Sequence, residues 1–172
     1  AMSSPTYALR VALLLKTFVK SIDMLYQNEN EKRIRFFKQY GLRVAIAVAP
    51  LTTLDSVNGI IDGEAIYLSG RTINYMSTSN KQKVIVKETM FFRSQNEELQ
   101  ARFDSIISLL DAIITKCSSK QCKVLFYKLS GLSEKEINQK IEINQSTISQ
   151  HSTAGSWCAI EKSVNYFEQY IL

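Results

Sequence analysis

A chain of 172 residues can hold one generous domain or two small ones. Its 45% hydrophobic and 22% charged residues are typical of a folded protein. The longest apolar runs, 11–15 and 44–50, are too short to cross a bilayer, and no signal-peptide pattern is visible. We therefore expect a cytoplasmic location and no membrane insertion.

The net charge of +5 suits nucleic-acid binding, but its distribution matters more than its sum. Residues 1–96 hold 13 Lys or Arg against 7 Asp or Glu, residues 97–116 hold 2 against 4, and residues 117–172 hold 6 against 5. The basic excess therefore lies in the first half of the chain.

The cysteines are three in number and form no CxxC pair. Reduced, partly buried thiols are the expected state of Cys117, Cys122 and Cys158. Their spacing suits neither zinc nor an iron–sulfur cluster, and His151 is the only histidine. No metal and no cofactor are expected.

The first half of the chain alternates helical and strand patterns. Pro5 suits the first turn of a helix that runs to about Tyr26, on hydrophobic residues at helical spacing. A polar loop and a basic-aromatic segment, 32–40, follow. The apolar run 43–49, RVAIAVA, predicts a buried strand.

A loop that can include a short irregular strand is expected over 50–61. Asp62 is then expected to cap a helix from Gly63 to about Ser77. A second strand is predicted over 83–87, KVIVK. A long helix over 97–116, opened by Asn96 or Gln95, is predicted to link an α+β half to an all-helical half.

Three capping patterns divide the last third into helices. Ser118 with Gln121 and Ser133 with Glu136 have capping-box spacing, and Asn144 is a suitable N-cap for a third helix. A fourth helix is predicted over 158–170, where hydrophobic residues form one stripe. These patterns indicate a compact helical bundle.

Residues 133–157 are the most informative stretch, because they predict two short helices joined by a tight turn. A small apolar core is expected from Ile137, Ile141, Ile143 and Ile148. The outward face of the second helix is expected to carry Gln145, Ser146, Thr147, Ser149 and Gln150. A polar helix presented in this way is how a helix-turn-helix reads base edges in DNA.

Two residues at the start of an earlier helix, Ser119 and Lys120, are expected to meet phosphate. The expected partners are double-stranded DNA and a second copy of the chain, held through the N-terminal half or the long helix. The alternative is a helical protein-interaction module that never touches DNA, because amphipathic helix bundles are common.

The chain resembles SatD-family bacterial proteins, whose C-terminal helix-turn-helix is similar to sigma-factor region-four and LuxR-type modules. The segments that carry the resemblance are 42–47 (LRVAIA), 62–71 (DGEAIYLSGR), 110–114 (LDAII), 131–137 (GLSEKEI), 143–148 (INQSTI) and 157–160 (WCAI). Three positions depart from the usual helix-turn-helix pattern. Asn138 replaces a small residue, Glu142 replaces the turn glycine and His151 replaces an apolar residue.

The resemblance implies that the N-terminal half is similar to the ferredoxin-like core of class III nucleotide cyclases, with its first, metal-binding strands missing. Asp62, Glu64 and Arg71 could then approach a nucleotide, but a cap, a helix-dipole partner and a surface cation are the simpler interpretation. No enzyme motif appears, and an enzyme is not expected.

The expected fold class is α+β, with a partial ferredoxin-like or cyclase-like half (1–96), a linking helix (97–116) and a helix-turn-helix domain (117–172). The expected function is transcriptional regulation by DNA binding. A remnant nucleotide-binding protein is a further alternative. The cations of 32–40 could contact phosphates while its aromatic residues stack on bases, or the aromatic residues could simply pack against the sheet.

Overall fold

A computed structural model describes residues 5–22, 32–55, 57–78 and 88–172. The described elements, in chain order, are α1 (Ala8–Ser21), α2 (Lys32–Tyr40), β1 (Val44–Val48), β2 (Leu51–Asp55), β3 (Ile60–Gly63), α3 (Glu64–Thr78), β4 (Met90–Ser94), α4 (Glu97–Lys116), α5 (Ser119–Leu129), α6 (Glu134–Ile141), α7 (Gln145–Ala154) and α8 (Trp157–Tyr170). The mixture of helices and strands confirms the predicted α+β class.

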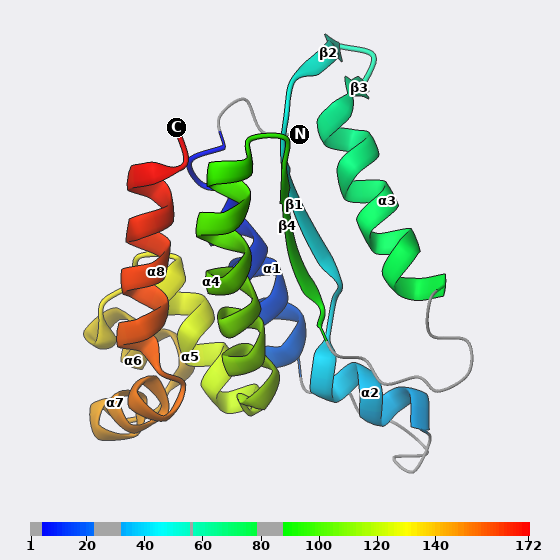
Figure 1. Ribbon diagram of the computed structural model, residues 1–172. Helices are drawn as coiled ribbons and strands as arrows, with labels where there is room; N and C mark the ends of the chain where they lie inside the picture. Colours follow the sequence, from blue (N-terminus) through cyan, green and yellow to red (C-terminus); the bar gives the residue numbers. More distant parts are fainter. Residues whose placement is uncertain (1–4, 23–31, 56, 79–87) are drawn as a thin grey trace.

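Strands β1 and β4 form a parallel pair at the centre, with Val44 opposite Met90 and Val48 opposite Ser94. Helices α1, α4, α5 and α8 lie on one side of this pair, and α3 lies on the other (Figure 1). The connection from β1 to β4 runs through the antiparallel β2–β3 hairpin and α3. Parallel strands need such a crossover, which explains the helix between them.

Side chains alternate between the two faces of a strand, and in β1 those on one face are larger than those on the other. Ile46 is buried in the main core, and Val44 and Val48 pack against the same core. Ala45 and Ala47 therefore point to the opposite face, toward α3. Small side chains there allow the helix to approach the strand closely.

Two lysines of α1 point into the protein rather than toward solvent. The Lys16 side chain is completely buried, and its Nζ lies 3.1 Å from Asp111 Oδ1 of α4. The same ammonium donates to the carbonyl oxygens of Tyr40 and Leu42, each at 3.1 Å, and to the Thr89 hydroxyl. Burial lowers the pKa of Lys16 from its ordinary value, although Asp111 opposes that shift.

Asp111 completes this buried network from the other side. Its carboxylate accepts hydrogen bonds from the Thr89 and Met90 amides, at 2.5 and 3.1 Å, and from the Thr89 hydroxyl at 2.7 Å. One turn further along α1, Lys20 Nζ donates to the carbonyl oxygens of Gln39 and Thr115. Helices α1, α2 and α4 and the start of β4 are thus tied together by polar contacts.

The main hydrophobic core draws on both halves of the chain. Leu9 of α1, Phe92 of β4, Phe103 of α4, Leu125 of α5 and Phe167 of α8 belong to one buried cluster. The rings of Phe103 and Phe167 are 4.7 Å apart, and Phe92 packs edge-on against both. The division of the chain into domains at residues 96 and 116 stays a prediction, because this single core contains residues from both sides of each position.

The predicted helix over 97–116 is confirmed in full, with Asn96 as its N-cap. The first helix is shorter than predicted, because α1 ends at Ser21. The loop expected over 50–61, with room for a short irregular strand, contains β2 and the start of β3, which pair with a register shift as a hairpin that was not predicted. Strand β4 was missed, and the strand predicted over 83–87 lies outside the described residues.

The predicted cap at Asp62 also needs correction, because Asp62 is the third residue of β3 and Gly63 precedes α3. Gly63 has a φ of 139°, and a Cβ there would lie 2.7 Å from the Leu51 Cα. The close hairpin therefore requires glycine, and it moves the start of the helix by one residue.

We expect Asp111→Asn to lower the free energy of unfolding by about 3–5 kcal/mol, because it leaves the buried Lys16 ammonium without its anion. Urea denaturation measures the loss. The matched control is Asp104→Asn on the same helix, where the side chain is 54% exposed and pairs with Arg93. That exposed pair should contribute less than about 1 kcal/mol. Equal losses in the two variants would contradict the role assigned to the buried pair.

Candidate nucleic-acid interface

Helices α5, α6 and α7 pack around a second, smaller core. Val124, Ile137 and Ile148 are fully buried in it, and each of the three helices contributes one of them. Four half-buried residues surround these three, namely Tyr127, Leu132, Ile141 and Ile143. The four predicted isoleucines are therefore confirmed as core residues, and their burial leaves the polar side of α7 to face outward.

Local hydrogen bonds fix where these helices begin. Capping boxes are present at Ser118 with Gln121 and at Ser133 with Glu136, as predicted. The Asn144 side chain accepts a hydrogen bond from the Thr147 amide and so caps α7. Hydrogen bonds from Ser133 lower the pKa of Glu136, which keeps this capping carboxylate ionised.

The turn between α6 and α7 has three residues, Glu142 to Asn144. Glu142 has a left-handed backbone with a φ of 55°, a conformation that normally favours glycine. Asn138 Nδ2 donates to the Ile143 carbonyl oxygen at 2.7 Å, which bridges the end of α6 to the turn. The larger residue at 138 thus supplies a contact that a small residue could not make.

Four of the five predicted reading residues, Gln145, Ser146, Ser149 and Gln150, are exposed on α7. The fifth, Thr147, is half-buried, and its hydroxyl donates to Asn144 Oδ1 at 2.5 Å. Thr147 therefore supports the cap rather than the outer surface. Ser146 donates to the same Asn144 oxygen at 3.0 Å but stays exposed.

The structure adds two residues that the sequence analysis missed. Thr153 and Ala154 are exposed and join Ser146, Ser149 and Gln150 around a shallow hollow of about 500 Å³. The spacing 146, 149, 150 and 153 follows one face of a helix, so the same periodicity could have identified Thr153. His151, the residue that departs from the expected apolar pattern, is half-buried.

Lysines near this surface lie on α5 and α6 and not on α7. Lys135 and Lys140 are exposed on α6, and Lys140 Nζ lies 5.7 Å from the centre of the Tyr127 ring. Lys120 is exposed and Ser119 half-buried at the start of α5, as predicted. Within the described parts of the chain, neither Ser119 nor Lys120 forms a hydrogen bond or an ion pair with α7.

Asp62, Glu64 and Arg71, the residues that could approach a nucleotide, have local roles within the hairpin and α3. Asp62 accepts a hydrogen bond from the Gly63 amide at 2.8 Å, and its bond with Tyr67 raises the pKa of that phenol. Arg71 lies over the Tyr67 ring, 5.9 Å from its centre. Glu64 occupies the first turn of α3. No group of three potential metal ligands occurs among the residues that the structure describes.

The basic-aromatic segment 32–40 forms α2. Arg35 and Lys38 are exposed on it, whereas Phe36, Phe37 and Tyr40 are half-buried. The rings of Phe36 and Tyr40 lie 6.1 Å apart. Partial burial of these rings limits the face that they could offer to a base, so the candidate interface is restricted to α5–α7.

The chain matches no protein-family model, no curated protein and no solved structure. Across the described ranges, no helix is both long enough and apolar enough to cross a membrane. Any functional assignment therefore depends on the chemistry of the surfaces themselves, and the α6–α7 unit is the surface with the most defined geometry.

We expect Glu142→Gly to raise the free energy of unfolding by about 0.5–1 kcal/mol, because glycine adopts a left-handed backbone without a Cβ clash. Urea denaturation measures the change. Glu142→Ala is the matched control, since it removes the same charge and keeps the clash. An equal gain in the alanine variant would show that charge, and not backbone strain, is responsible.

Proposed function

We propose that the protein binds double-stranded DNA through α7 and acts as a transcriptional regulator. The observation that supports this most is the exposed face of α7, where Gln145, Ser149, Gln150 and Thr153 are uncharged and polar. Solvent-exposed helices usually carry Lys and Glu. Amide and hydroxyl side chains suit base edges, where a glutamine can bond an adenine at two atoms.

In this proposal α7 enters the major groove and α6 crosses the backbone, which is the usual docking of a helix-turn-helix. Lys135 and Lys140 of α6 neutralise phosphates. Ser119 and Lys120 make a further phosphate contact at the start of α5. The three-residue turn and the Asn144 cap support a fixed angle between the two helices, so that the glutamines are oriented before binding.

The proposal includes a homodimer. Few cations surround α7, so a single copy could contact only a few phosphates. If one copy neutralises about three phosphates, the logarithm of its binding constant falls with the logarithm of salt with a slope of roughly −3. Two copies on adjacent half-sites double that slope and extend the base contacts. A symmetric dimer would read half-sites one helical turn apart.

Membership of the SatD family, the ferredoxin-like or cyclase-like character of the first half and a cytoplasmic location stay predictions. The competing function is a protein-docking role for the same face of α7. The absence of Lys and Arg from α7 favours that alternative. Salt dependence separates the two, since contacts to phosphate release counterions and contacts to a neutral protein surface do not.

The test is fluorescence anisotropy with mixed genomic DNA fragments between 50 and 200 mM salt. We expect binding that weakens steeply with salt. The magnitude of the salt slope should decrease by about one for each bound copy that carries Lys135→Ala or Lys140→Ala. Lys162→Ala is the matched control, because Lys162 is exposed on α8 outside the proposed interface. Its slope should equal that of the parent protein.

Selection from a random duplex library tests sequence reading separately. We expect Gln150→Ala to relax the preference at one base pair by about tenfold, since a two-point contact with a base is lost. Binding without salt dependence, or no binding even at low salt, would contradict the DNA proposal. An unchanged preference in the Gln150 variant would remove that residue from the reading face.

A further inference from the structure

Helix α1 buries two lysines beside hydrophobic residues on its inner face, and it exposes a second set of hydrophobic residues on its outer face. Lys16 and Lys20 are buried, and Arg10 forms an ion pair with Glu168. The exposed residues between 5 and 22 are all hydrophobic: Tyr7, Val11, Leu15, Phe18 and Ile22. Their spacing of three or four places them on one stripe. A contiguous exposed stripe of this kind marks an interaction surface.

Among the described strands, β1 has one edge that no other strand pairs with, and this edge lies beside Val11 and Leu15. In the described part of the sheet β1 pairs only with β4, and the Val44 amide donates to the Thr89 carbonyl oxygen at 2.8 Å. Because ladder bonds alternate along a parallel strand, the backbone groups of Ala45 and Ala47 point to the open edge. An unpaired edge of this kind is a template for another strand.

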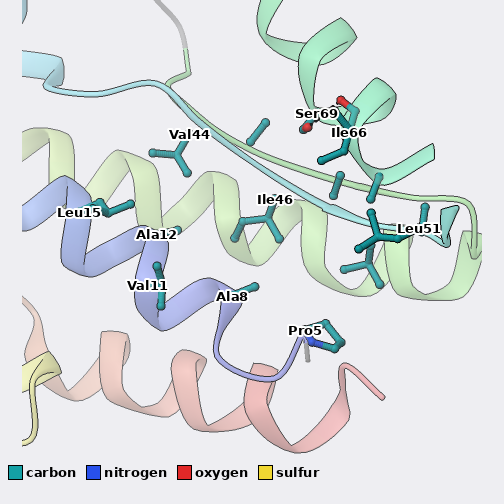
Figure 2. Close-up of a pocket in the computed structure, with 15 residues that line it drawn as sticks. Pro5, Ala8, Val11, Ala12, Leu15, Val44, Ile46, Leu51, Ile66 and Ser69 are labelled. Atoms are coloured by element: carbon teal, nitrogen blue, oxygen red, sulfur yellow. Dashed lines mark hydrogen bonds between the residues drawn. The ribbon is translucent and has the colours of Figure 1, made fainter. Parts of the chain in front are cut away.

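The open edge forms the floor of an apolar groove of about 470 Å³ (Figure 2). Val11 and Leu15 of α1 line one wall, and Ile66 and Ser69 of α3 line the other, with β1 between them. Val11 and Leu15 belong to both the stripe and the groove, and so connect the outer face of α1 to the strand edge. This surface offers backbone hydrogen bonds at its centre and hydrophobic side chains on both sides.

We propose that a second copy of the chain covers this surface, with β1 of each copy paired antiparallel about a two-fold axis at Ile46. Ala45 then lies opposite Ala47 of the partner subunit, and the parallel pair becomes a four-stranded sheet. The axis also brings the stripes of the two α1 helices together. The proposal rests on the homodimer part of the proposed function and does not depend on DNA.

Charge at the two ends of the groove favours a second copy as the occupant. Arg43, exposed at the start of β1, carries a positive charge. Beyond the other end, Leu51 is paired with Gly63, which is flanked by the acidic residues Asp62 and Glu64. An antiparallel arrangement sets Arg43 opposite position 49 of the other copy, toward that acidic end. The surface is therefore complementary to itself, as a two-fold interface requires.

Sedimentation velocity of the purified chain over a concentration series tests the proposal. We expect a dimer at tens of micromolar, and a dissociation constant at least about a hundredfold higher for Leu15→Glu, which places two charges near the axis. Leu109→Glu is the matched control, because Leu109 is exposed on α4 outside the groove. It should dimerise like the parent protein.

Ala45→Pro tests the strand pairing itself. Proline removes the amide that points to the open edge and leaves the bonds to β4 in place, so the fold should persist while the dimer dissociates. Ala45→Gly keeps the amide and should remain dimeric. If the proline variant loses its circular dichroism signal, Leu15→Glu and the charge variants described next still decide the question.

A charge exchange tests the orientation. Arg43→Glu and Glu64→Lys should each weaken the dimer by about tenfold, and the double variant should recover most of the loss. A dimer that survives Leu15→Glu would overturn this surface and leave the homodimer standing. A monomer at every concentration would overturn both and would leave DNA binding to be judged by its own salt dependence.

Discussion

The buried ion pair between Lys16 and Asp111 is the contact on which the arrangement of the N-terminal half depends. An ammonium without solvent has to be surrounded by acceptors, and here they come from Asp111, Thr89 and the chain between α2 and β1. Asp111 in turn holds the amides that lead into β4. One pair of charges thereby fixes where α1, α4 and the start of β4 lie relative to one another.

The lysine of this pair lies on a helix that has hydrophobic residues on both of its faces. Lys16 and Lys20 share the inner face of α1 with Leu9, Ala12 and Leu13, and the exposed side chains on its outer face are also hydrophobic. Exposing such a stripe to water is unfavourable. The backbone groups at the edge of β1 beside it have no partner strand among the described residues. The buried polar network and the proposed two-fold interface are thus two sides of one helix. Neither could be predicted from the sequence, which indicates only a helix with hydrophobic residues at helical spacing.

The geometry of helices α5–α7, in contrast, is set by contacts between residues close together in the chain. Caps at Ser118, Ser133 and Asn144 begin three helices, and isoleucines hold them together. The positions that depart from the usual pattern are compensated nearby. Asn138 bonds the turn, and Glu142 accepts a left-handed backbone at some cost in stability. Such a unit can present a polar helix in a constant orientation, which is the property that the DNA proposal uses.

The sequence by itself determined the helices from residue 97 onward, their caps, the small isoleucine core and most of the polar face of α7. These features depend on contacts between residues three or four apart, which spacing reveals. It could not place β4, the β2–β3 hairpin, the half-buried state of Thr147 or the burial of Lys16. Strand pairing and the burial of a charge depend on partners distant along the chain, such as Thr89 and Asp111 for Lys16. Only the tertiary structure brings those partners together, and only it decided which side of α1 faces out.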